Sequence, residues 1–357
     1  MILSRIDRYI GRGVVVGTLL VLAVIAAVTT LLSLAEALPS YGRGSFGVAA
    51  LVRYVLLSQA RKLYEIFPVA TLIGTLLGLS ALALGSELTA MRAAGVSTLR
   101  ILGAAMKTGV ALVLVSTLFG EFVVPWAENT AQLGRARALE TSLQQKGSGL
   151  WLREGSRYVN IGEVLPDLSL LRVSVFEVNE AFRLHAQTYA QRAVYVPTEK
   201  AWRLEGVRDT TVNEDQLKVQ RVEQRLWQAS LTPEMVNVFS VQPEGLSAIQ
   251  LARYIEHLRN NGQDTARYRL AFWQKVLLPL ATATMILLAA PFVFQHFRSG
   301  GMSKRLFIGV LLGLVFVILN RTFGFLGLLY GLPPILGAGI PLLLFFLLAL
   351  YALRRVA

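Results

Sequence analysis

The stretch WAENTAQLGRARALETSLQQKGSGL (residues 126–150) opens a polar segment that continues to Leu270, and we call residues 126–270 the polar island. The island carries 18 Lys/Arg and 17 Asp/Glu side chains, far too many charges for the interior of a bilayer. The blocks on either side, residues 1–125 and 271–357, are each long and apolar enough for three membrane-spanning helices. We therefore expect three spans, an inserted water-exposed domain and three more spans.

Composition supports membrane insertion. The chain has 357 residues, of which 54% are hydrophobic and only 16% are charged, and the apolar residues gather in long runs. The first run, Gly13 to Ala35, is too long for the core of a signal peptide, so we interpret it as the first span. The absence of cysteine excludes disulfides, a cysteine nucleophile and cysteine-based metal sites.

Charge is unevenly distributed along the chain. The net charge is +13, of which the polar island contributes +1 (18 minus 17) and the two apolar blocks +12 (17 minus 5). Basicity concentrated in the membrane-embedded blocks favours anionic lipid over nucleic acid as a partner. Arg5, Arg8 and Arg12 precede the first span, so the positive-inside rule predicts a cytoplasmic N-terminus. Six spans then place the C-terminus inside and the polar island outside.

The polar island shows two kinds of periodicity. Residues 128–145 and 247–261 have helical patterns, and Ser247 with Gln250 forms the sequence pattern of a capping box. Between them, short alternating segments predict β-strands in an antiparallel sandwich or roll. These segments are 157–161, 171–175, 192–196, 201–204 and 217–222.

Small residues and one short polar loop stand out within the apolar blocks. Gly74 and Gly78, and again Gly309 and Gly313, form GxxxG pairs that allow close helix packing. The loop at residues 85–100 predicts a short cytoplasmic helix. Its expected features are a Ser86 cap, Glu87 in the first turn, an end at Gly95, and one face shared by Glu87, Ala90, Met91 and Ala94. The helix is either an interfacial turn or a docking helix for a cytoplasmic partner.

Several cations contradict the positive-inside rule because they lie near the outer ends of the predicted spans. They are Arg53, Arg61, Lys62, Arg135, Arg137, Arg267, Arg269, Lys275 and Arg321. One interpretation is snorkelling and ion pairing with Glu65, Glu121 or Glu128. The other is a ring of cations that attracts a phosphorylated amphiphile, for which Arg supplies bidentate contacts and Lys a point charge. Lys107 and Glu121 lie near the two ends of the third span.

An enzyme site cannot be assembled from the sequence. The chain has no GxxxxGK[ST] P-loop, no HExxH and no GxSxG motif, and its three histidines are scattered over different regions. Three function classes remain open: a lipid-exporting permease, an ion-coupled secondary transporter, and a non-transporting anchor. The near absence of carboxylates inside the spans is unfavourable to the secondary transporter.

Over nearly its whole length the chain resembles the permease subunits of the bacterial lipopolysaccharide export ABC transporter, the LptF/LptG (YjgP/YjgQ) family, and looks closest to the LptG branch. Together the matching pieces are more specific than any one of them. They are Ile6-Asp-Arg-Tyr-Ile-Gly11, Phe67-Pro68 with Gly74 and Gly78, Ser86-Glu-Leu88 with Met91 and Gly95, Gly120-Glu121, Leu231-Thr-Pro233, Asn260-Asn-Gly-Gln-Asp264 and Tyr330-Gly-Leu-Pro-Pro334.

The resemblance implies a membrane α-helical protein of six spans, residues 1–125 and 271–357, with a periplasmic antiparallel β-jellyroll at residues 126–270. It also implies an inner-membrane half-transporter that pairs with a homologous LptF-like subunit. Its further partners would be a cytoplasmic LptB-like ATPase dimer, which binds the ATP, a single-span LptC-like subunit with a periplasmic bridge, and lipopolysaccharide. No cofactor of its own is implied.

The resemblance also assigns roles to residues. Residues 85–100 would be the coupling helix, with Glu87 contacting the ATPase and Met91, Arg92 and Gly95 in the same contact segment. Arg61 and Arg135 fall where the family tends to have basic residues facing lipid A. Lys62, Arg137 and Arg321 are further candidate phosphate contacts, of which Arg321 matches no family motif. LptG members can carry a lysine near the outer end of the first span, and that position here is Ser33.

Overall fold

A computed structural model describes most of the chain, with gaps in the loops and in the polar island. The described residues are 4–138, 143–146, 149–154, 156–164, 168–178, 183–212, 217–229, 231, 233, 236, 242–260, 264–294 and 302–355. They form two compact units. The first comprises residues 1–36, 55–128 and 243–357, and the second comprises residues 37–54 and 129–242.

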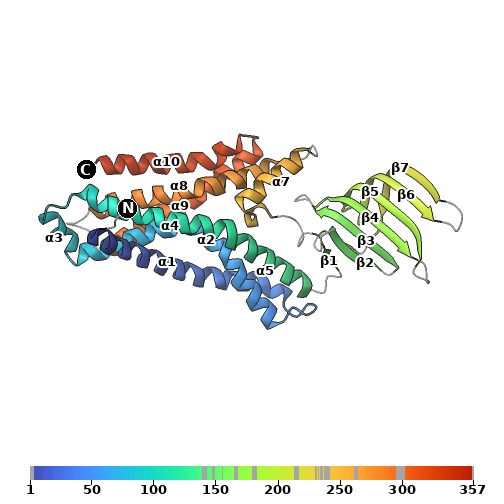
Figure 1. The fold of residues 1–357 in the computed structure, drawn as a ribbon, viewed down its shortest axis with the longest axis horizontal. Helices are drawn as coiled ribbons and strands as arrows, with labels where there is room; N and C mark the ends of the chain where they lie inside the picture. The colour runs from blue at the N-terminus through green and yellow to red at the C-terminus, as the bar shows by residue number, and fades with distance from the viewer. Residues whose placement is uncertain are drawn as a thin grey trace. The chain divides into compact units, whose positions relative to one another are not determined.

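Within the described residues, six helices are long and apolar enough to cross a membrane, as the sequence predicts. The first block gives α1 (Arg5–Ala37), extended by the short 3-10 turn η1 (Leu38–Ser40), then α2 (Val48–Leu84) and α4 (Thr98–Leu118). The π-helical turn η2 (Phe119–Val123) joins α4 to α5 (Val124–Ala138). The second block gives α8 (Ala266–Phe294), α9 (Met302–Leu329) and α10 (Pro334–Arg354). The first turn of α1, the last turn of α10 and the short helix α3 (Glu87–Ala93) lie at one end of the bundle (Figure 1).

The α2 helix is the centre of the bundle, because 72% of its most apolar window is buried within the protein. Its Leu72, Leu76 and Leu79 are fully buried and share a core with residues of α4 and α8. On one side, Gly74 and Gly78 of α2 meet the α1 backbone at Gly13, Gly17 and Thr18 so closely that a Cβ at Gly74 would collide with Thr18. On another side, Gly309 and Gly313 of α9 receive Leu76 and Val69 of α2. Both predicted GxxxG pairs are therefore packing sites.

The inserted domain is one antiparallel sheet of seven described strands in sequential order. The strands are β1 (Leu143–Lys146), β2 (Gly149–Glu154), β3 (Arg157–Val164), β4 (Leu170–Val178), β5 (Leu184–Val196), β6 (Ala201–Val212) and β7 (Leu217–Trp227). Each strand pairs with the next along the chain, and Figure 1 shows β2 to β7 following one another across the sheet.

One face of the sheet carries the core of this domain. Val159 and Ile161 of β3 are fully buried, and register pairs them with Val175 and Val173 of β4. Trp202 of β6 is also fully buried and donates a hydrogen bond from Nε1 to the Leu231 carbonyl oxygen at 2.8 Å. The alternation that predicted strands is thus the alternation of core and outer faces.

The fold class is confirmed: six apolar helices with an antiparallel β domain inserted between the third and fourth spans. The described strands follow one another in the order of a meander. A short turn at residues 197–200, for example, joins β5 to β6.

Three local predictions need correction. The helix expected over residues 128–145 ends as α5 at Ala138, and residues 143–146 form β1. Ser86 adopts a left-handed conformation (φ 57°) and makes no side-chain cap, while Gly95 with φ 89° does follow the end of α3. The expected apolar face is also displaced, because Leu88 is the fully buried residue of α3, whereas Ala90 and Ala94 are exposed.

Thr232 and residues 261–263 of the family motifs lie outside the described residues.

The α1–α2 crossing predicts an asymmetric response to added methyl groups. Gly74→Ala should lower the stability of the detergent-solubilised protein by about 1–3 kcal/mol, because the new Cβ meets backbone that cannot move aside. Gly103→Ala in α4 is the matched control, since nothing lies within 4 Å of a Cβ built there. The measurement is the midpoint of thermal unfolding, and equal midpoints for the two variants would contradict this packing.

Candidate functional site

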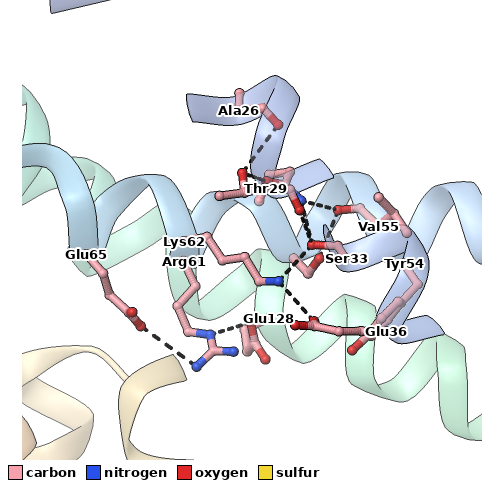
Figure 2. Close-up of polar contacts among 12 residues, drawn as sticks. Ala26, Thr29, Ser33, Glu36, Tyr54, Val55, Arg61, Lys62, Glu65 and Glu128 are labelled. Atoms are coloured by element: carbon pink, nitrogen blue, oxygen red, sulfur yellow. Dashed lines mark hydrogen bonds and ion pairs between the residues drawn. The ribbon is translucent and has the colours of Figure 1, made fainter. Parts of the chain in front are cut away.

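A chain of polar contacts joins α1 to α2 within the first unit (Figure 2). The Thr29 hydroxyl donates to Gln59 Oε1 at 2.6 Å, and Gln59 Nε2 donates to Ser33 Oγ at 3.0 Å. The Lys62 ammonium donates to the same Ser33 oxygen at 2.8 Å and pairs with Glu36 Oε2 at 3.1 Å. The Lys62 ammonium of α2 therefore lies beside Ser33, the α1 position at which LptG members can carry a lysine.

Arg61, the neighbour of Lys62, is held by carboxylates. Its Nε lies 3.3 Å from Glu128 Oε2, and its Nη1 lies 3.8 Å from Glu65 Oε1 one turn along α2 (Figure 2). The Glu128 side chain is only 8% exposed and packs beside Gly245 in the 3-10 turn η3 (Pro243–Gly245). The ion pairing weighed in the sequence analysis is confirmed for Arg61 with Glu65 and Glu128.

Arg135 belongs to the second unit, where it ties the end of α5 to the segment that precedes Val55. Its Nη2 donates to Ser40 Oγ at 3.0 Å and its Nη1 to the Tyr54 hydroxyl at 3.2 Å. The guanidinium carbon also lies 5.0 Å from the centre of the Tyr54 ring, a cation–π distance. The side chain of Arg137 lies outside the described part of the chain.

The remaining predicted cations have different surroundings. Arg321 is exposed on α9 and attracts the Glu65 carboxylate. Arg267 pairs with Glu244 at 3.5 Å, and the Lys275 ammonium donates to the Leu246 carbonyl oxygen and lies 5.3 Å from the centre of the Tyr64 ring. Within the first unit, the structure brings Arg61 and Lys62 together on α2; the roles of all five candidate lipid contacts stay predictions.

Glu121 has a structural role that the sequence does not reveal. It lies in the π-helical turn η2, and its carboxylate accepts hydrogen bonds from the backbone N–H groups of Ala248 (2.9 Å) and Ile249 (3.1 Å). These are the first residues of α7 (Ala248–Asn260), where an anion is favourable. The predicted Ser247–Gln250 capping box is confirmed beside it, with reciprocal bonds of 2.9 and 3.1 Å. Glu121 therefore anchors α7 to the third span.

The candidate coupling segment contains a short exposed helix, α3, that is fixed by two apolar residues. Leu88 is fully buried, and Met91 packs half-buried against the same core. Glu87 is half-buried and Arg92 is exposed. The Glu87 carboxylate interacts electrostatically with the Tyr9 hydroxyl on α1. An exposed helix held by an apolar anchor is the geometry expected of a docking element, and its partner stays a prediction.

A metal centre is not visible in the described residues, among which no group of three or more His, Asp or Glu side chains could hold an ion. The polar side chains described above form ion pairs and hydrogen bonds, which can bind a charged ligand and hold helices in position.

The Glu121 cap predicts a local effect on α7. Glu121→Gln removes the negative charge at the helix N-terminus and should cost about 1 kcal/mol locally, which is about a fivefold faster exchange of the α7 amide hydrogens. Glu256→Gln on the exposed face of α7 is the control and should leave exchange unchanged. Hydrogen exchange read by mass spectrometry decides, and unchanged protection in Glu121→Gln would contradict the anchoring role.

Comparison with known proteins agrees with this architecture. Residues 8–355 match the sequence model of the family described as lipopolysaccharide export system permease LptF/LptG. The lipopolysaccharide export system permease protein LptG of Escherichia coli strain K12 is 36% identical over 352 residues, which cover 98% of each chain. The protein of the same description in Haemophilus influenzae is 32% identical over 354 residues, which cover 99% of each chain. On these grounds the chain belongs to the LptF/LptG family of lipopolysaccharide export permeases.

Proposed function

We propose that this chain is the membrane-embedded permease subunit of an ATP-driven exporter that extracts lipopolysaccharide from the outer leaflet of the inner membrane. It passes the lipid to a periplasmic bridge that leads to the outer membrane. The observation that carries the proposal is family membership over nearly the whole chain, together with six spans and an inserted β domain.

Energetics supports a separate motor. Each buried CH₂ group of an acyl chain stabilises a lipid in the bilayer by roughly 0.8 kcal/mol, so extracting a lipid with several chains needs an external source of free energy. The sequence holds no P-loop, and a partner ATPase therefore supplies that energy. A homologous permease subunit completes the membrane path, and a single-span subunit with the bridge receives the lipid.

Orientation follows from charge and from function together. The α3 end of the bundle faces the cytoplasm, where an ATPase dimer is located, and both chain termini lie on that side. The basic residues Arg5, Arg8 and Arg12 at the start of α1 support this orientation. The sheet of β1 to β7 then lies in the periplasm, where it passes the lipid onward.

Lipid phosphates bind at the cations near the periplasmic ends of the spans. A cation whose carboxylate partner is exposed exchanges that partner for a phosphate more easily than a cation held by a buried carboxylate. Lys62 pairs with Glu36, whose side chain is 70% exposed, and so exposed a pair is weak enough for a phosphate to replace it. Arg61 pairs with the nearly buried Glu128, so the main role of the Arg61 side chain is structural. Lys62 is therefore the leading phosphate contact of the first unit, ahead of Arg61 and Arg321. Arg135 and Arg137 are the candidate phosphate contacts of the second unit.

The exporter function is tested by reconstitution. The chain is co-purified with its homologous permease, ATPase and single-span partners, placed in vesicles that contain lipopolysaccharide, and supplied with ATP. We expect release of the lipid to a soluble periplasmic acceptor that requires ATP. Release at an equal rate without ATP would instead support an ion-coupled transporter, and no release at all would support the anchor.

Lys62 gives a sharp test of lipid binding. Lys62→Glu should weaken binding of labelled lipopolysaccharide to the complex at least fivefold, because it places a carboxylate beside Glu36, whereas Lys62→Arg should stay within twofold of the original chain. Lys218→Glu makes the same charge change at an exposed residue of β7 and should have no effect. An unchanged affinity in Lys62→Glu would remove this residue from the lipid site.

Glu87 tests the docking helix. Glu87→Lys should lower ATP-dependent lipid release at least tenfold while the chain still unfolds at the same temperature, because the side chain is half-buried at the surface of α3 and not in the core. Thr89→Lys, at an exposed position of the same helix, is the control for added charge. Normal release by Glu87→Lys would exclude the coupling role.

A further inference from the structure

The sequence motif Ile6-Asp-Arg-Tyr-Ile-Gly11 forms the start of α1, and its residues Asp7, Tyr9 and Gly11 have no part in the function proposed above. Its Asp7 side chain is fully buried, which is costly for a carboxylate unless cations and hydrogen bonds satisfy it. Ser4 and Asp7 cap the helix reciprocally: Ser4 N donates to Asp7 Oδ2 at 3.1 Å, and Asp7 N donates to Ser4 Oγ at 3.3 Å.

Asp7 also joins α1 to α4. The Lys107 ammonium lies 2.8 Å from Asp7 Oδ2, and Arg100 Nη2 lies 3.2 Å from Asp7 Oδ1. Arg100 also donates to Ser4 Oγ at 3.0 Å. Lys107, which lies near one end of the third span, is thus paired with this buried carboxylate. One carboxylate therefore fixes two cations of α4, the helix that follows α3.

Two further residues of the motif face the same region. The Tyr9 hydroxyl interacts electrostatically with Glu87 on α3. Gly11 lies against Thr108 of α4, so close that an added Cβ would collide with the Thr108 hydroxyl oxygen. Asp7, Tyr9 and Gly11 therefore attach the start of α1 to α3 and α4 at three successive points.

The other end of α1 carries Ser33 and Glu36, whose side chains contact Lys62. Twenty-four residues separate Tyr9 from Ser33, which is about 36 Å of continuous helix at 1.5 Å per residue. The helix has no internal proline. One uninterrupted helix therefore connects the contacts at α3 and α4 with Ser33 and Glu36, the two residues that hold Lys62.

We infer that the start of α1 is a transmission joint, in which Asp7 and Tyr9 are positioning residues that make α1 move with α3 and α4. The inference rests on the proposed function and adds to it the route from the motor contact to the lipid site. Neither residue touches the lipid. Weakening the joint therefore leaves ATP hydrolysis intact and lowers the amount of lipid released for each ATP hydrolysed.

The test measures this ratio in vesicles with the complete complex. Asp7→Asn should lower the ratio at least fivefold and Tyr9→Phe at least twofold, while subunit assembly and ATP hydrolysis stay within twofold of the original complex. Arg8→Gln changes one charge on an exposed side chain of the same turn and should leave the ratio unchanged. A misfolded fraction lowers release and hydrolysis together, so the ratio separates positioning from folding.

A disulfide between α1 and α4 tests whether a covalent link can replace the contacts of Asp7. The chain has no cysteine, and a Cβ at residue 11 would lie 3.5 Å from the Thr108 Cβ, within the range of a disulfide. Gly11→Cys with Thr108→Cys, oxidised, should transport normally and should restore the ratio in the Asp7→Asn background; the reduced pair is its control.

Two results overturn the inference: an unchanged ratio in both Asp7→Asn and Tyr9→Phe, or loss of transport on oxidation of the cysteine pair. If Asp7→Asn fails to assemble, Tyr9→Phe decides, since it removes only an oxygen from a half-exposed side chain. Absence of ATP-dependent release by the original complex would instead refute the proposed function, so the two failures are distinguishable.

Discussion

The close packing of α2 against its neighbours is the constraint on which the helical unit depends. Helices surrounded by lipid gain little from the hydrophobic effect and associate through close contact, which requires small residues at the crossing. Gly74 and Gly78 let α1 approach to backbone contact, and Gly309 and Gly313 let α9 receive the leucine and valine side chains of α2. A single helix thereby holds the residues around Lys62 in its first half and leads into α3 directly after its other end.

An unpaired charge in an apolar medium is destabilising, so the buried charged side chains of this protein lie beside partners of opposite charge. Asp7 is acceptable in the bundle because Lys107 and Arg100 reach it, and Glu128 because Arg61 does. Where a pair is exposed, as for Lys62 with Glu36, its net stabilisation is small and the cation can exchange its partner for a ligand. Burial of the carboxylate partner therefore separates the basic residues that stabilise the fold from those that are available to bind an anionic ligand.

The structure also explains why α7 and the π-helical turn occur together. A π-turn inserts an extra residue into a helix and redirects the side chains near it, and such turns are frequent at functional sites. Here the redirected residue is Glu121, whose carboxylate caps α7. Because α7 precedes α8 in the chain, the third and fourth spans are linked through this contact as well as through the α4–α8 packing of Gly109 against Ile286.

The sequence alone determined the class of the protein and the number of its spans, because hydrophobic runs and the period-two pattern are local properties. Gly95 after α3 and the Ser247–Gln250 box could likewise be predicted, since such signals act within a few residues. Partners distant in sequence could not: Lys107 with Asp7, Glu121 with α7, and Glu128 with Arg61 each join residues more than 60 positions apart. Only the tertiary structure decides such pairs, because which side chains meet depends on how helices cross and rotate, and spacing along one helix carries no record of that.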